Sequence, residues 1–172
     1  FGFLLFLTLT LLHMAHYCSN LYTFTGGMPM DVLYKRFTEL MDHAEIDYDS
    51  IDCNTEKNTI VVSTESKWTC ESIGNLKLIR MAKRLDLTFL NEFEELSFFE
   101  YGMHLVCPEK AIIHRLTKPT IISIDKETNS YYDSLNNLLV ATIPKRMKDL
   151  LLKYNIDKYA EPISTGDSQR NG

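Results

Sequence analysis

The first thirty residues of the chain contain no aspartate, glutamate, lysine or arginine. The beginning of this stretch is the most apolar, because nine of the twelve residues from Phe1 to Leu12 are phenylalanine or leucine. Burial of each such side chain contributes about 1.5–3 kcal/mol, so a run of this kind does not stay exposed to water. The segment must therefore lie in a membrane, in a protein-conducting channel or in a hydrophobic core.

Three interpretations of Phe1–Leu12 are open. A secretory signal has an apolar region of about 7–15 residues, which this run matches, although no pair of small residues marks a cleavage site after it. A transmembrane helix needs about 20 apolar residues, so Phe1–Cys18 would span a bilayer only with further apolar residues before it. In the third interpretation, residues 1–12 lie in the core of a larger cytosolic protein, of which this chain is a fragment.

The first two interpretations predict a secreted or membrane-anchored protein in which Phe1–Leu12 contacts a membrane or the translocon, and the third predicts a cytoplasmic protein. The sequence Gly26-Gly27-Met28-Pro29 interrupts regular structure and indicates a domain boundary. We therefore predict a hydrophobic signal or anchor segment over residues 1–27, a single domain over residues 28–160 and a flexible tail over residues 161–172.

The domain is predicted to combine helices with an antiparallel sheet. The spacing of apolar residues predicts helices over residues 31–45 and 72–85, and Pro144 is placed to open a third helix. β-Branched or alternating sequence predicts strands over residues 59–64, 96–107, 111–116, 120–125 and 130–134. Because several strands follow one another over short connections, we predict an α+β fold. It is an antiparallel β-meander with flanking helices packed on one face, plus the hydrophobic N-terminal segment.

The charged residues suggest which partners the domain accepts. The formal net charge is −5 at pH 7, and non-specific binding of nucleic acid depends on a positive surface, so we predict no nucleic-acid partner. Lys77, Arg80 and Arg84 recur at i, i+3 and i+7 on one face of the second predicted helix. These three residues are the candidates for binding an anionic ligand or a protein partner. The alternative is a solvated helix face whose charges pair within the chain.

Cysteine and histidine supply the candidates for catalysis. The chain has four cysteines, which are too few for a disulfide-based scaffold. A catalytic thiol needs a base within hydrogen-bond reach, so Cys70 or Cys107 would have to meet His104 or His114 in the fold. The alternative is a core thiol and a histidine at a strand edge, because no local signature surrounds any of these residues.

No metal site and no cofactor site are predicted. Asp47-x-Asp49-x-x-Asp52 begins like a calcium-binding loop, but the positions that require glycine and glutamate hold Asp52 and Asn58. The histidines and cysteines do not supply a complete set of zinc ligands at a recognisable spacing.

These observations lead to one leading hypothesis and two alternatives. The leading hypothesis is a non-catalytic binding or interaction domain, exported or membrane-tethered by its N-terminus, with an unknown ligand. The first alternative is a thiol-dependent hydrolase or transferase that uses a cysteine–histidine pair. The second is the fragment of a larger cytosolic protein, with residues 1–12 in its core. The sequence favours the binding domain because it contains no complete catalytic constellation.

Overall fold

The computed structural model of the protein describes residues 17–67, 73–95, 100–116 and 137–156. Helices and strands follow along the chain in the order β1 (Tyr17–Thr25), α2 (Met30–Ala44), β2 (Ser50–Asn54), β3 (Thr59–Lys67), α3 (Ile73–Arg84), β4 (Thr88–Glu95), β5 (Glu100–Val106), β6 (Ala111–Leu116) and α6 (Lys145–Lys153). Residues 137–142 are also helical. The predicted strands over residues 120–125 and 130–134 and the predicted tail over residues 161–172 lie outside the described residues.

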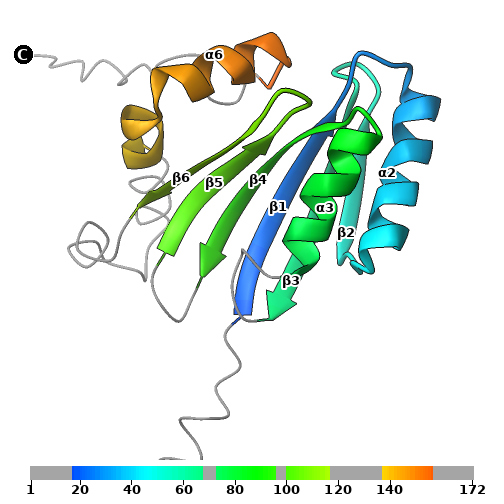
Figure 1. Ribbon diagram of the computed structural model, residues 1–172, viewed down its shortest axis with the longest axis horizontal. Coiled ribbons are helices and arrows are strands. Elements are labelled where there is room, and N and C mark those ends of the chain that lie inside the picture. The colour runs from blue at the N-terminus through cyan, green and yellow to red at the C-terminus, as the bar shows by residue number, and fades with distance from the viewer. Residues whose placement is uncertain (1–16, 68–72, 96–99, 117–136, 157–172) are drawn as a thin grey trace, which may run out of the picture.

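The strands form one antiparallel sheet with the order β2-β3-β1-β4-β5-β6 (Figure 1). From β1 to β4 the chain runs strand-helix-strand-strand-helix-strand, and β1 lies between β3 and β4. This is the split β-α-β arrangement. The remaining strands, β5 and β6, add to β4 as a meander. The structure thus confirms the predicted α+β class and the antiparallel sheet, and it confines the meander to the last three strands.

The central strand β1 comes from the uncharged N-terminal stretch. Tyr22 of β1 is in register with Val62 of β3 on one side and with Asn91 of β4 on the other. The predicted domain boundary is therefore corrected: residues 17–25 belong to the sheet and not to a separable hydrophobic segment.

The physical reason for this error is that two environments exclude charge equally well. A membrane segment and a strand in the middle of a covered sheet both make an unpaired charge costly, so a lack of charge does not distinguish them. The interpretations of Phe1–Leu12 remain predictions, because residues 1–16 lie outside the described part of the chain.

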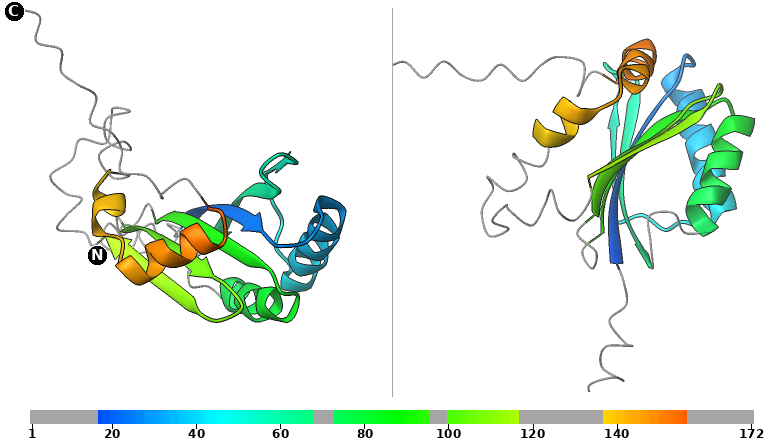
Figure 2. Two further views of the ribbon diagram at one scale, coloured as in Figure 1. Left: turned by 90° about the horizontal axis from the view of Figure 1, so that it is seen from above. Right: turned by 60° about the vertical axis from the view of Figure 1, so that its left-hand side comes forward.

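Helices cover both faces of the sheet (Figure 2). On one face, α2 and α3 pack over a core that includes Tyr22, Phe24 and Phe89. On the other face, α6 and residues 137–142 pack over Leu90, Met103 and Leu105. Phe89 and Leu90 are neighbours that point to opposite cores, as the two-residue repeat of a strand requires. The predicted packing of the helices on one face is corrected accordingly.

The helix α2 forms as its sequence predicts. The five residues of its apolar stripe are all buried: Leu33, Phe37, Leu40, Met41 and Ala44. The helix ends where Glu45 takes a left-handed conformation with φ of 58°. The Glu45 N–H donates to the Asp42 carbonyl at 3.2 Å, and the Ile46 N–H donates to the Met41 carbonyl at 3.1 Å, which satisfies the last carbonyls of the helix. This end of α2 places the Glu45 side chain beside α3.

Candidate functional site

A surface trough runs between α2 and α3, which lie side by side on one face of the sheet. The two helices are antiparallel, because Glu45 at the end of α2 pairs with Lys77 early in α3, while Arg36 near the start of α2 bonds to Leu85 just after α3. A helix of the length of α2 spans roughly 22 Å at about 1.5 Å per residue. Two surface cavities lie between the helices, and together they are called the trough below.

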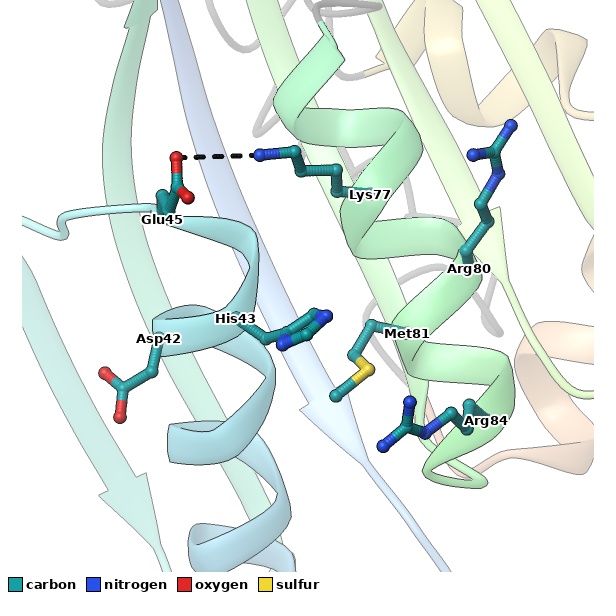
Figure 3. A pocket seen from close by; sticks show the side chains of 7 residues that line it. All are labelled: Asp42, His43, Glu45, Lys77, Arg80, Met81 and Arg84. Atoms are coloured by element: carbon teal, nitrogen blue, oxygen red, sulfur yellow. Dashed lines mark ion pairs between the residues drawn. The ribbon is translucent and has the colours of Figure 1, made fainter.

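The first part of the trough is a cavity of about 560 Å³ (Figure 3). Its lining comes from the second half of α2 and from α3: Asp42, His43, Glu45, Lys77, Arg80, Met81 and Arg84. In Figure 3, His43 and Arg84 extend into the gap on either side of Met81, while Arg80 extends along the side of α3 away from α2. Met81 is 5% exposed and forms an apolar floor.

One ion pair bridges the two helices at the end of this cavity. The Lys77 Nζ atom lies 3.5 Å from Glu45 Oε2, and the two side chains are 45% and 81% exposed. An exposed pair of this kind contributes at most about 1 kcal/mol and exchanges readily with other charged groups. Lys77 is therefore available to an anion that competes with Glu45.

The second part of the trough is a cavity of about 470 Å³ at the opposite end. It is lined by the first half of α2 and by the end of α3: Val32, Lys35, Arg36, Glu39, Arg84, Leu85 and Asp86. Arg84 lines both cavities and so lies between them. Three basic and two acidic side chains surround the second cavity, and its walls include the apolar side chains of Val32 and Leu85.

Arg36 is held in place at this end of the trough. Its Nη1 atom donates a hydrogen bond of 2.6 Å to the Leu85 carbonyl, which follows the last residue of α3. A cation is favoured there because the carbonyl end of a helix carries partial negative charge. The bond also explains how α2 and α3 keep their spacing where the trough is lined by charged residues.

The structure brings together the three predicted ligand-binding residues. Lys77, Arg80 and Arg84 all line the first cavity, as their spacing on one helix face implied. Three further lining residues come from the neighbouring helix and were not predicted from the sequence: Lys35, Arg36 and His43. No local signal identifies these α2 residues, because their role depends on the packing of α2 against α3.

The two candidate histidines lie on opposite faces of the sheet. His104 is in register with Asn91 on β4 and is 7% exposed. Burial, and secondarily the nearby charge of Arg115, lowers the pKa of His104 to about 4. His114 points to the other face, where its Nε2 atom lies 2.9 Å from the Thr142 hydroxyl oxygen. Burial lowers the pKa of His114 as well.

The candidate thiol Cys107 does not meet either histidine. Its Sγ atom donates to the Lys110 carbonyl at 3.3 Å, and burial raises the pKa of the thiol above its ordinary value. A thiol with a raised pKa is protonated at neutral pH and is a poor nucleophile. Among the described residues, no contact joins Cys107 to His104 or His114. The other candidate, Cys70, lies outside the described residues.

The cysteines are in different redox states. Cys18, on the central strand, is disulfide-bonded. Cys53 is an exposed free thiol on β2, and Cys107 is a buried free thiol. A disulfide forms and persists mainly in oxidising compartments such as the secretory pathway.

Across residues 17–67, 73–95, 100–116 and 137–156, no three histidine, cysteine or acidic side chains gather in a way that could hold a metal ion. In the same ranges, no helix combines the length and the apolar composition that a membrane crossing requires.

Comparison with known proteins gives no assignment. No family model matches the chain, and neither a curated protein nor a solved structure matches it. The chemistry of the trough is therefore the basis on which a function is argued.

Proposed function

We propose that the protein is a non-catalytic binding domain, exported or membrane-tethered, whose α2–α3 trough receives an acidic segment of a protein partner. The observation that carries this proposal is the position of Arg84, which lines both cavities of the trough. A guanidinium group at that point can contact an anion from either side, and arginine is well suited to interfaces because its planar group binds carboxylates in pairs of hydrogen bonds.

The charges along the trough support a partner with acidic groups. Within the described part of the chain, Lys77 forms an ion pair only with the exposed Glu45 side chain, and Arg84 forms no ion pair. Glu39, Asp42, Glu45 and Asp86 also line the trough, so that acidic and basic side chains are mixed along it. A protein segment with mixed charges is complementary to this surface, whereas a uniform polyanion would meet four carboxylates.

The redox state of Cys18 supports export. The Cys18 side chain is fully buried in the centre of the sheet and is disulfide-bonded. Such a bond is expected in a protein that folds in an oxidising compartment. The proposal of a leader or anchor in Phe1–Leu12 leads to the same compartment by an independent argument.

The proposed function can be tested by nuclear magnetic resonance spectroscopy, with the full chain labelled isotopically at its nitrogen atoms. The probe is a short blocked helical peptide in which glutamate and lysine are spaced four residues apart. We expect the amide signals of α2 and α3 to shift on titration, and the shifts to decrease with added salt. A matched peptide with glutamine in place of glutamate should produce much smaller shifts. The proposal fails if neither peptide shifts α2 and α3, or if the shifts lie on α6.

A further inference from the structure

We infer that Arg36 and Arg84 form a two-guanidinium site for a single carboxylate of the partner, in the cavity at the Val32 end of the trough. This inference rests on the proposed function and names the chemistry of the group that is bound. Both arginines line this cavity, and they come from different helices. A carboxylate between them can accept hydrogen bonds from two planar donor groups.

Arg36 is already oriented before a ligand binds. Its bond of 2.6 Å to the Leu85 carbonyl uses Nη1 and leaves the other guanidinium N–H groups for a ligand. The Arg36 side chain is half-buried, so the charge is less screened by water than on a fully exposed arginine. A donor that is fixed before binding loses little side-chain entropy when the ligand arrives.

The charge of the cavity lining favours a ligand with a single negative charge. The cavity is lined by the basic residues Lys35, Arg36 and Arg84 and by the acidic residues Glu39 and Asp86. The formal charge of this lining is therefore +1, from three basic and two acidic groups. A singly charged carboxylate balances that excess, while a phosphate or a polyanion adds repulsion with Glu39 and Asp86.

The cavity also offers apolar surface to the body of the ligand. Val32 and Leu85 add aliphatic surface to the lining of the same cavity. The methylene groups of an aspartate or glutamate side chain can pack against such surface while the carboxylate reaches the two arginines. The site therefore favours an acidic side chain of a protein over a small inorganic anion.

The test compares conservative variants by calorimetry, with the same glutamate–lysine peptide as the probe. Arg36→Lys and Arg84→Lys keep the positive charge but lose the planar pair of donors. We expect each variant to weaken binding by about tenfold, which corresponds to the loss of one strong hydrogen bond to a charged group. Lys83→Arg is the matched control, because Lys83 is an exposed neighbour of Arg84 that lines neither cavity.

The outcomes separate this inference from the proposed function. If the peptide binds α2 and α3 but the two lysine variants bind it as tightly as the original chain, the trough binds by charge alone and the two-arginine site is wrong. If the peptide does not bind the original chain, the proposed function fails as well. Tighter binding of inorganic phosphate, or of vesicles containing phosphatidylserine, would also overturn the inference.

A folding control is needed because Arg36 contributes to the α2–α3 contact. Thermal unfolding monitored by circular dichroism shows whether Arg36→Lys remains folded at the temperature of the binding experiment. Arg84 makes no hydrogen bond or ion pair within the described residues, so Arg84→Lys tests the site without this complication.

Discussion

The two faces of the sheet are covered by helices that are held in different ways. The face beneath α2 and α3 is built on rings: Phe24 packs against Phe37 and Phe89 with ring centroids 5.1 and 5.5 Å apart. The face beneath α6 has an aliphatic core that includes Leu90, Met103 and Leu105. Large interlocked rings bury more apolar area per residue than aliphatic side chains do. The α2–α3 layer is therefore expected to be the more firmly fixed of the two.

Exposed polar contacts accompany the aliphatic core on the α6 side. The helical residues 137–142 are joined to β6 through His114 and Thr142, whose side-chain atoms lie 2.9 Å apart. The end of α6 is joined to the β5–β6 turn through Glu109, whose carboxylate accepts hydrogen bonds from Lys153 and Tyr154. These contacts are exposed, and exposed charged contacts contribute little to stability. The α2–α3 trough therefore lies on the face whose packing is expected to be the more rigid.

The largest expected effect is the loss of an aromatic ring from the α2–α3 side. Phe24 is fully buried on the central strand, so Phe24→Ala should lower the free energy of unfolding by about 3–5 kcal/mol through lost packing and a residual cavity. Chemical denaturation measures the loss. Native-state hydrogen exchange should show faster exchange in every strand of the sheet, because β1 pairs with both β3 and β4.

Met147→Ala on α6 is the matched variant for the other face. Met147 is also fully buried, but it belongs to the layer with the aliphatic core. We expect faster exchange to be concentrated in α6 and β6, with β1 and β3 little changed. If Met147→Ala accelerates exchange throughout the sheet as much as Phe24→Ala does, the two faces are not independent in the way proposed here.

The sequence predicted the helices better than the strands. Each residue of the apolar stripe of α2 is buried, and β6 covers the predicted residues 111–116, because local periodicity specifies such elements. Three strands were missed. The strand β1 was assigned to the hydrophobic N-terminal segment. The strand β4 is buried along almost its whole length, so it shows no alternation, and β2 is a short, exposed edge strand.

The candidate site was predictable in part for the same reason. The spacing of Lys77, Arg80 and Arg84 is a local property of one helix, and the structure places all three along the trough. Arg36 could not be identified, because its contact with Leu85 joins residues 49 positions apart. Long-range pairing of helices is set by the whole sheet topology, which periodicity does not encode.

A smaller effect is expected from acid, and it distinguishes the two histidines. The pKa of His104 falls from 6.5 to about 4 in the folded protein, mainly through burial. Between these two pH values, the unfolded chain therefore binds a proton at this histidine more readily than the folded chain does. The free energy of unfolding keeps its full His104 contribution above pH 6.5, and this contribution falls as the pH is lowered toward about 4. The maximum loss from His104 is on the order of 3 kcal/mol. Urea denaturation over this pH range measures it.

The variant His104→Gln removes the titrating group from the core. Its free energy of unfolding should change less between neutral pH and pH 4 than that of the original chain. His114→Gln is the control on the other face, and because His114 is only half-buried, its removal should change the pH dependence less. A pH dependence that His104→Gln leaves unaltered would contradict the assignment of the effect to His104.

The smallest effect is expected at the contact between Glu109 and α6. Hydrogen bonds from Lys153 and then from Tyr154 lower the pKa of Glu109 to about 2 from an ordinary value of 4.5. The stabilisation from this carboxylate is therefore present above pH 4.5 and is lost as the pH falls through about 2, a range below that of His104.

Because the contact is exposed, Glu109→Gln should hardly change the unfolding midpoint at neutral pH. Hydrogen exchange at the C-terminal end of α6 should nevertheless become faster, because the contact with Glu109 is lost there. The rest of the helix should change little, because Met147 and Leu151 still anchor it in the aliphatic core. Unchanged exchange there would mean that the aliphatic core alone fixes α6, and the proposed contrast between the two faces would then rest on packing without any polar contribution.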